Sequence, residues 1–291
     1  MVVRKLRRAG GADAVTATAA VVAAVATGLT GCSPGAADAA PPVGAVVANG
    51  GKAGDGAAGG SLDAVRAVPG LLVRAGTSKA RTALEMATGG TRLTIEGEGG
   101  YDFRAGRGRV RVLLPEDGDR PRRRITELFT PGALYMKNRG AGVPADKWVR
   151  IDTTTLADGN LVTGGATDPG AAAELLRAAR RVTYVGEARI GRVPVAHYRG
   201  TTDIAAAARL APPRVRGALA AAAKGFATDT VPFDAYLDEE GRLRKVRHRF
   251  SFTNGEREVD VESTTELYGF GAPVDVPLPP QRDIYAGKIA G

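Results

Sequence analysis

The sequence predicts an α+β fold built on one long antiparallel sheet of about eleven strands. Three observations predict it. Apolar and polar residues alternate with a period of two over most of the chain after residue 61, which is typical of half-buried strands. Two or three segments have helical spacing instead. With 44% hydrophobic and 24% charged residues and a mean hydropathy of −0.11, the 291-residue chain carries enough apolar side chains for a packed core.

The alternation is clearest toward the C-terminus. Val231 to Leu237 alternates apolar with other residues and then turns through Glu239-Glu240-Gly241, which leads into a hairpin. These strands form a three-stranded meander. Eight earlier segments alternate in the same way: Ser78–Thr88, Thr91–Phe103, Arg107–Leu114, Arg124–Thr130, Ala133–Lys137, Lys147–Thr154, Arg181–Ile190 and Val193–Thr202.

The hairpin is centred on Asn254-Gly255, the strongest short turn signal in the chain. A two-residue loop there pairs Thr253 with Glu256 and thereby sets the register of the whole ladder. The expected pairs are Phe250 with Val259, His248 with Val261, Arg249 with Asp260 and Arg247 with Glu262. One face of the hairpin is then apolar and the other carries opposed charges.

Helices are expected at three places. Asp168-Pro169 has the residue types of a helix start, and Ala172, Leu175, Leu176 and Ala179 follow with helical spacing over about three turns. An Ala-rich segment from Ile204 to about Lys224 is helical but interrupted at Pro212-Pro213. A further helix is expected near Leu62–Arg74, which contains Pro69-Gly70.

Residues 1–31 have the parts of a secretory signal. A basic head is followed by an uncharged, Ala- and Val-rich stretch, Ala14–Leu29, and by small residues at a cleavage point; the head consists of Arg4, Lys5, Arg7 and Arg8. Sixteen residues are fewer than the roughly 20 that a membrane-spanning helix needs, so a permanent transmembrane anchor is the weaker interpretation.

The run Leu29-Thr30-Gly31-Cys32 resembles the lipobox of bacterial lipoproteins. That resemblance implies a diacylglyceryl thioether on Cys32 and cleavage just before it, with Asp13 a mild departure from the usual pattern. Cys32 is the sole cysteine, so no disulfide is possible. The alternative is a chance cysteine near an ordinary cleavage site, left as a free thiol. Two acyl chains on one residue suffice for stable anchoring.

The chain is expected to divide into a signal peptide, 1–31, a lipidated cysteine with an Ala/Gly/Pro linker, 32–60, and a folded domain, 61–291. As a flexible coil, such a linker spans some tens of Å. Removing residues 1–31 takes away four positive charges and one negative, so the net charge falls from +9 to about +6. The densest basic cluster, Arg120 to Arg124, is interpreted as a solvated loop, with a specific anion site as the alternative.

No catalytic residue, metal ligand or cofactor site is expected. The two histidines, His197 and His248, lie in different strands, and each is expected to be structural. With Cys32 alone and no histidine cluster, a Cys/His metal site is excluded. Gly31 to Gly35 matches G-x-S-x-G but lacks the strand-to-helix context of a nucleophile elbow. The run Gly97 to Gly100 lacks the third glycine of a dinucleotide loop.

The order of elements resembles that of the LolA/LolB/LppX-like lipoproteins over about residues 61–270, most closely the LppX/LprG branch of high-GC Gram-positive bacteria. The residues that carry the resemblance are Asp168-Pro169, Tyr184 to Glu187, Val193 to Gly200, Asp203, and Pro232 to Asp238 with Gly241-Arg242-Leu243. These residues are recurrent sequence features of the family and do not form a catalytic motif. The resemblance implies an eleven-stranded antiparallel half-barrel whose concave face is capped by helices over an apolar cavity.

The resemblance implies a protein that is lipid-anchored at the extracytoplasmic face of the cell membrane. It binds an acylated lipid or other apolar ligand in the half-barrel, and its wider role is transport across the envelope. Acyl chains filling such a cavity contribute about 0.8 kcal/mol per CH₂. The candidate lining residues are Phe233, Ala235, Phe250, Phe252, Val259 and Val261. The same side chains can instead pack as a filled core. The alternative function is an envelope interaction or sensor lipoprotein without lipid cargo. Nucleic acid is not an expected partner outside the cell.

Overall fold

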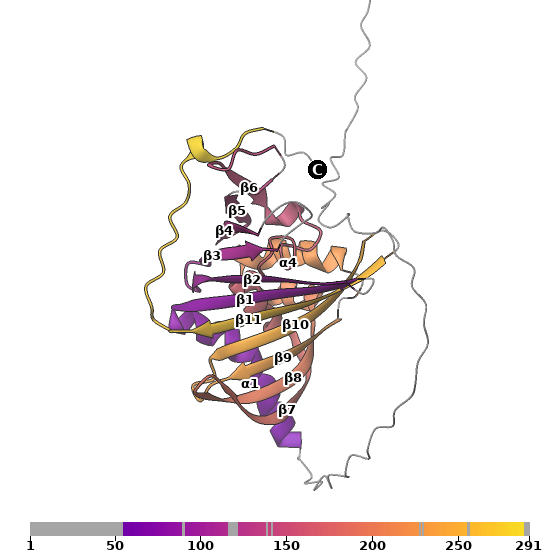
Figure 1. Ribbon diagram of the computed structural model, residues 1–291. Coiled ribbons are helices and arrows are strands. Elements are labelled where there is room, and N and C mark those ends of the chain that lie inside the picture. Colours follow the sequence, from indigo (N-terminus) through magenta and orange to yellow (C-terminus); the bar gives the residue numbers. More distant parts are fainter. Residues whose placement is uncertain are drawn as a thin grey trace, which may run out of the picture. The chain divides into compact units, whose positions relative to one another are not determined.

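The computed structural model describes residues 55–88, 91–115, 122–137, 139–140, 142–226, 228, 230–254 and 257–287 (Figure 1). The predicted signal peptide, Cys32 and most of the predicted linker lie outside these residues. The described residues belong to one compact unit. Its first element, helix α1, Asp55–Ala75, begins before Ser61, the expected start of the folded domain. Among the described helices, none has both the length and the apolar character to cross a membrane.

Eleven antiparallel strands form one open sheet with the curl of a half-barrel, which confirms the predicted fold class (Figure 1). The sheet order is β6-β5-β4-β3-β2-β1-β11-β10-β9-β8-β7, so two meanders meet where β1 pairs with β11. The strands are β1 Thr77–Thr88, β2 Thr91–Asp102, β3 Arg107–Leu114, β4 Arg123–Thr130, β5 Ala133–Lys137, β6 Trp148–Asp152, β7 Ala179–Ile190, β8 Val193–Asp203, β9 Thr230–Leu237, β10 Leu243–Asn254 and β11 Arg257–Tyr268.

The helices lie on one face of this sheet (Figure 1). Besides α1 they are η1 Thr153–Thr155, α2 Pro169–Leu175, η2 Leu176–Ala178, α3 Ile204–Leu210 and α4 Pro213–Gly225. A further short helix near the C-terminus, η3 Gln281–Asp283, lies instead beside the edge strand β6. The predicted interruption at Pro212-Pro213 is confirmed, because it separates α3 from α4. Helix α1 continues through Pro69 and is longer than expected.

The three helical turns predicted after Asp168 are present over residues 169–178, but the last of them, η2, is a 3-10 helix, and Ala179 is not helical. Asp168 caps the helix as expected, accepting hydrogen bonds from the backbone N–H groups of Gly170 (2.7 Å) and Ala171 (3.3 Å). However, α2 ends at Leu175, and Ala179 is already the first residue of β7, paired with Thr202 of β8. The backbone hydrogen bonds of the sheet thus override the helical spacing of Ala179.

The predicted hairpin register is wrong by two residues. Asn254 pairs with Arg257, so the connection consists of the two residues between them, which lie outside the described residues. Phe250 therefore lies opposite Val261, and Arg249 lies opposite Glu262. The other expected pairs change in the same way, with Phe252 opposite Val259, Ser251 opposite Asp260, His248 opposite Ser263 and Arg247 opposite Thr264. A shift of two keeps every residue on its expected face.

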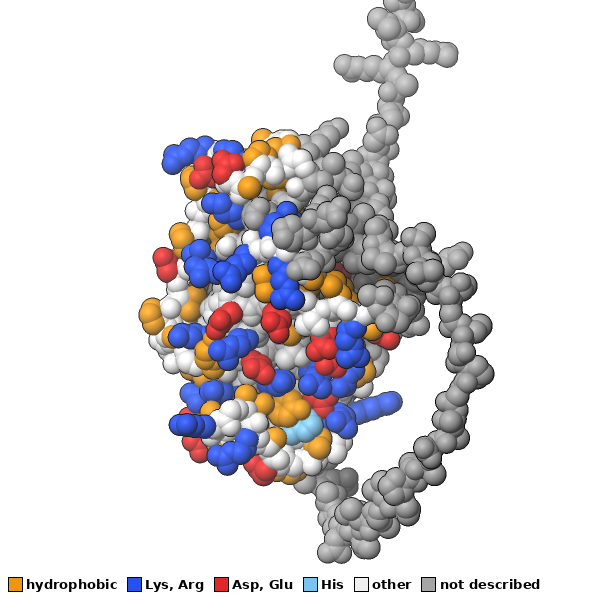
Figure 2. All heavy atoms as spheres, viewed as in Figure 1, with side chains coloured by type: hydrophobic (Ala, Val, Ile, Leu, Met, Phe, Trp, Pro, Cys, Tyr) orange, Lys and Arg blue, Asp and Glu red, His pale blue; other side chains and the backbone are white. Residues whose placement is uncertain are grey.

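The alternation of the strands separates two faces. The inner face, toward the helices, carries the buried apolar side chains of the core, and it is continuous across both meanders. The outer face carries the charged ladder, with Lys245 paired to Glu266 (2.9 Å) and Glu262 paired to both Arg247 (3.0 Å) and Arg249 (3.1 Å). Figure 2 shows Lys and Arg side chains intermingled with Asp and Glu over this face.

A glycine on the inner face allows β2 and β3 to approach each other. A Cβ atom at Gly99 would overlap the carbonyl oxygen of Arg109 in β3, and backbone atoms cannot swing away. We expect Gly99→Ala to lower the free energy of unfolding by about 1–3 kcal/mol through overpacking. Gly60→Ala in α1, where a Cβ meets nothing within 4 Å, is the control and should leave stability unchanged or raise it by up to about 1 kcal/mol. Urea unfolding measures both, and equal midpoints would contradict the packing of β2 against β3.

Candidate functional site

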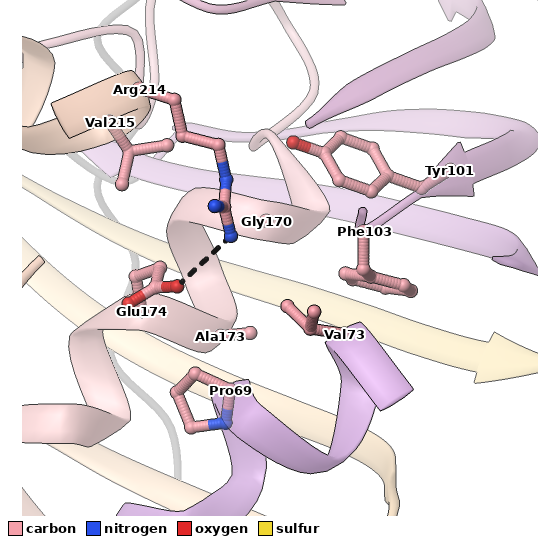
Figure 3. Close-up of a pocket in the computed structure, with 9 residues that line it drawn as sticks. All are labelled: Pro69, Val73, Tyr101, Phe103, Gly170, Ala173, Glu174, Arg214 and Val215. Carbon is pink, nitrogen blue, oxygen red and sulfur yellow. Dashed lines mark ion pairs between the residues drawn. The ribbon is translucent and has the colours of Figure 1, made fainter. Parts of the chain in front are cut away.

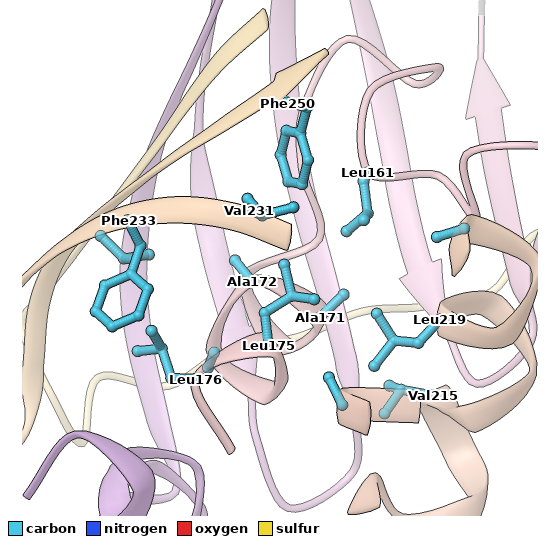
Figure 4. Close-up of a cluster of buried hydrophobic side chains, with 14 of the residues drawn as sticks. Leu161, Ala171, Ala172, Leu175, Leu176, Val215, Leu219, Val231, Phe233 and Phe250 are labelled. Atoms are coloured by element: carbon cyan, nitrogen blue, oxygen red, sulfur yellow. The ribbon is translucent and has the colours of Figure 1, made fainter. Parts of the chain in front are cut away.

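The candidate site is the interior, defined as the space between the inner face of the sheet and helices α1 to α4. In Figure 4, Phe233 and Phe250 of the sheet point toward leucines of the helical side, among them Leu161 and Leu175. Of the six residues expected to line a cavity, five have buried side chains on the inner face: Phe233 (0% exposed), Ala235 (0%), Phe250 (2%), Val259 (8%) and Val261 (1%). The side chain of Phe252 lies outside the described residues.

Helices α3 and α4 cover the interior with few large side chains. Their sequence is dominated by alanine, and the buried residues of α4 are Val215, Leu219 and Ala222. The C-terminal end of α4 is held by Phe226, whose ring stacks on that of Phe250 at 5.0 Å between centroids. Because apolar stabilisation grows with buried area, a helix pair rich in alanine is held less firmly than one rich in leucine.

A small cavity lies where α1, β2, α2 and α4 meet (Figure 3). Its volume is about 10 Å³, which is room for about one water molecule. Figure 3 shows Tyr101 and Phe103 on one side, Val73 of α1 below them, and Arg214 paired with Glu174 across the opening. The guanidinium of Arg214 lies 3.7 Å from the Glu174 carboxylate, which also pairs with Arg177 at 2.7 Å. This cavity is too small for an acyl chain.

Two groups at this cavity have raised pKa values: Tyr101, which lines it, and Asp168, which accepts a hydrogen bond from the lining residue Gly170. Burial, with the negative charge of Asp168 beside it, raises the pKa of the Tyr101 hydroxyl well above its usual range. Burial also raises the pKa of Asp168, although its hydrogen bonds at the start of α2 act in the opposite direction. Tyr101 therefore remains a neutral hydroxyl at the N-terminal end of α2.

Polar side chains also occupy the centre of the inner face. Thr82 of β1, Thr265 and Ser263 of β11 and His248 of β10 lie on three neighbouring strands, and none is more than 4% exposed. We call these four residues the inner polar patch. Ser263 shares a hydrogen bond with Thr167 (2.5 Å), whereas both ring nitrogens of His248 and the hydroxyls of Thr82 and Thr265 have no hydrogen-bond partner among the described residues. Burial lowers the pKa of His248 to about 3, so the ring is neutral.

A buried carboxyl group lies on the other half of the sheet. Glu127 of β4 is fully buried, and neither of its oxygens has a hydrogen bond within the described residues. The nearest cation is Arg139, 4.0 Å away, which donates instead to the backbone oxygens of Gly164 (2.6 Å) and Thr163 (3.2 Å). Burial raises the pKa of Glu127 to about 8, against the attraction of Arg139. Glu127 is therefore mainly protonated at neutral pH.

The sequence indicated some of these residues and not others. Glu127 was not predicted from the sequence, although a charged residue between Ile125 and Phe129 interrupts the apolar inner-face alternation and could have indicated it.

His197 and His248 lie on opposite faces of the sheet, and Nε2 of His197 is hydrogen-bonded to Asp234 at 2.7 Å. Of the basic cluster, Arg120 and Pro121 lie outside the described residues, and Arg123 is the first residue of β4. The described residues contain no group of three or more His, Cys, Asp or Glu side chains arranged for a metal ion.

The buried Glu127 gives a pH-dependent stability. Its pKa of about 8 in the folded chain is above the ordinary value of 4.5, so its contribution is most favourable below pH 4.5 and is lost as pH rises through 8. A glutamine at this position resembles the protonated form at every pH. We expect Glu127→Gln to match the parent near pH 4.5 and to be more stable at pH 8, by on the order of 4 kcal/mol.

Thermal unfolding between pH 4.5 and 8 measures this difference. The control is Glu96→Gln, an exposed carboxylate in β2, which should change stability by less than about 0.5 kcal/mol throughout. A pH-independent difference between Glu127→Gln and the parent would contradict the burial of an uncompensated carboxyl group.

Known proteins similar to this chain are found only among solved structures, since no family model and no curated protein matches it. It is similar to LprF from Mycobacterium bovis, at 13% identity and a TM-score of 0.40, over 76% of this chain and 97% of that one. It is also similar to the lipoprotein LppX from Mycobacterium tuberculosis, at 10% identity and a TM-score of 0.40, over 75% and 99%.

A LolA superfamily protein from Nitrosomonas europaea is similar at 11% identity and a TM-score of 0.34, over 76% of this chain and 94% of that one. Similarities at this level concern the fold and carry no information about a ligand. The open eleven-stranded antiparallel sheet with helices on one face is the architecture that the resemblance to LolA/LppX-like lipoproteins implies.

Proposed function

We propose that this protein is a lipoprotein, anchored through Cys32 at the extracytoplasmic face of the membrane, that binds an acylated lipid or other apolar ligand in its interior and carries it within the envelope. The observation that carries the proposal is the composition of the interior. An apolar inner face is covered by an alanine-rich helix pair, and the same face holds polar groups that lack partners among the described residues. The residues proposed to contact the ligand are those expected from the sequence, including Phe233 and Phe250.

The unpartnered polar groups are difficult to explain as parts of a purely structural core. Leaving a buried donor or acceptor unpaired costs about 1–3 kcal/mol, and such groups in a native protein need a reason. A ligand with a polar group on an apolar chain provides one, because its chain can lie along Phe233 and Phe250 while the inner polar patch meets the polar group.

Opening the interior requires α3 and α4 to move away from the inner face. This movement exposes chiefly Ile204 of α3 with Val215, Leu219 and Phe226, each costing about 1.5–3 kcal/mol. An acyl chain contributes about 0.8 kcal/mol per buried CH₂, so roughly ten such groups offset that cost. Binding and helix displacement are therefore of similar energy, as a carrier that loads and unloads needs.

A second function is favoured by a specific observation. The cavity among α1, β2, α2 and α4 measures about 10 Å³, and the side chains expected to line a cavity pack against the helices instead. A filled interior suits an envelope interaction or sensor lipoprotein that contacts protein partners with its surface and carries no lipid.

A disulfide that fixes α4 tests the carrier proposal. A Cβ atom at Gly217 lies 3.9 Å from Cβ of Thr154 in η1, within the range for a disulfide. We expect Thr154→Cys/Gly217→Cys, in a chain with Cys32→Ser, to take up a fluorescent palmitate analogue when reduced and to lose most of that uptake when oxidised. Gly217→Cys alone is the matched control and should be insensitive to oxidant.

Mass spectrometry of organic extracts complements the uptake measurement. The unmodified protein should co-purify with an acylated lipid. Absence of lipid from the extract, together with no uptake by the reduced variant, would contradict the carrier function and favour the partner-binding function. Equal uptake by oxidised and reduced variants would contradict movement of α4 as the route of entry.

The anchor is tested separately at Cys32. Cys32→Ala removes the thiol that accepts the lipid, so we expect the protein either in the medium or as uncleaved precursor, and fractionation with immunoblotting distinguishes the two. Ser33→Ala keeps the cysteine and should remain membrane-bound at its mature size. Membrane retention of mature Cys32→Ala protein would refute the anchor.

A further inference from the structure

A groove on the outer face of the sheet is separate from the interior. It lies over β7 to β10, has a volume of about 430 Å³ and is on the face opposite the helices. Three arginines line it, Arg181 of β7, Arg199 of β8 and Arg249 of β10, and no acidic residue does among the described residues. Such a volume is within the range of ligand sites.

The groove lies where the ladder between β7 and β8 is interrupted by bulges. The ladder between them is irregular between Arg180 and Thr183 and again between Tyr184 and Gly186. Within the first irregularity Arg181 has a φ of 50°, a left-handed conformation that is uncommon for residues other than glycine. Bulges of this kind redirect side chains and are frequent at functional sites.

The charges around the groove are not balanced. Asp234 lies beneath it at 2% exposure, paired with Arg199 (3.0 Å) and Arg249 (3.2 Å) and bonded to His197. Burial opposes ionisation of Asp234, but the hydrogen bonds from His197 and Arg199 lower its pKa, so it is charged. The outer-face carboxylates that pair with these arginines are Asp234 and Glu262, and Glu262 is shared with Arg247.

Arg181 has no hydrogen-bond or ion-pair partner in the part of the chain that the structure describes. The three arginines that line the groove and the neighbouring Arg247 thus have only two carboxylates among the described residues to pair with, Asp234 and Glu262. The excess positive charge includes the exposed guanidinium of Arg181, whose N–H donors are free. Guanidinium groups suit phosphate because their paired N–H donors match its oxygens.

The groove also has an apolar part that a purely ionic site does not need. Val185 is 49% exposed and Pro232 is exposed beside it, and both line the groove with the edge of Phe233. Positive charge next to exposed apolar side chains suits a surface that is both anionic and partly apolar, as the headgroup region of a membrane is.

The position of the groove relative to α1 is relevant to this assignment. Helix α1 packs against β7, and Arg66 of α1 donates to the backbone oxygen of Ala179, the first residue of β7 (3.0 Å). The N-terminal end of α1, to which the expected linker from Cys32 leads, lies near β7 (Figure 1). The groove and the N-terminal end of α1 thus both lie next to β7, on opposite faces of the sheet.

We propose that this groove binds the phosphate headgroup of an anionic phospholipid, so that β7 to β10 rest on the membrane surface to which the protein is tethered. This inference depends on the proposed anchor for its biological setting, but the groove can be tested without it. The occupant is a lipid in a bilayer and not free phosphate or an apolar cargo.

The test uses the chain from residue 32 onward with Cys32→Ser, which keeps all of the compact unit and carries no acyl chain. Co-sedimentation is measured with vesicles of phosphatidylcholine alone and with one quarter phosphatidylglycerol. We expect binding only to the second kind, and Arg181→Gln should weaken it about fivefold, the effect of one arginine at an anionic surface. Arg209→Gln, an exposed arginine of α3 on the opposite side of the sheet, is the matched control and should change it less than about twofold.

Each outcome decides the question. Equal weakening by Arg181→Gln and Arg209→Gln would show general charge attraction and overturn the groove as a site. Binding of inorganic phosphate by calorimetry that Arg181→Gln abolishes, without binding to either vesicle, would assign the site to a free anion and overturn the proposal. Because neither variant breaks an ion pair among the described residues, unchanged melting temperatures will verify folding. Failure here leaves the Cys32 anchor and lipid uptake untouched, since those are measured by fractionation and by palmitate binding.

Discussion

The pairing of β1 with β11 is the contact on which the rest of the structure depends. It joins the two meanders through a ladder from Lys79 opposite Tyr268 to Ala87 opposite Asp260, and no other pair of described strands links them. Without it, the inner face divides into two narrow sheets. Helix α1 packs mainly against β7 of one meander and also contacts β1 of the other.

This pairing also places the chemistry of the interior. Thr82 of β1 lies opposite Thr265 of β11, and His248 of β10 lies opposite Ser263, so residues far apart in sequence form the inner polar patch. The unpartnered polar groups of this patch lower stability only locally, because the large apolar residues on the same strands are well buried. Arg247 and Arg249 alternate with these residues along β10 and therefore lie on the outer face. There they form ion pairs with Asp234 and Glu262 beside the groove. One alternation therefore separates an apolar interior from a charged exterior.

Ionisable groups in the interior limit its stability from both directions of pH. The pKa of His248 falls from 6.5 to about 3, so its contribution to stability is lost as pH falls from 6.5 to 3; the pKa of Glu127 rises from 4.5 to about 8, so its contribution is lost as pH rises from 4.5 to 8. Around neutral pH both are mainly uncharged. The interior is then at its least polar, which is the condition that suits an apolar ligand beneath α3 and α4.

The sequence by itself determined the strands, the helix break at Pro212-Pro213 and the faces of the C-terminal hairpin, because pleat alternation and proline sterics are local. It did not determine the hairpin register, since the turn preference of Asn254-Gly255 is weaker than a ladder in which β11 pairs on both sides. Nor did it determine that Ala179 would leave its helix for β7. The absence of a hydrogen-bond partner for Glu127 among the described residues and the convergence of Arg181, Arg199 and Arg249 were decided only by the tertiary structure, because they depend on which distant strands become neighbours and where β7 bulges.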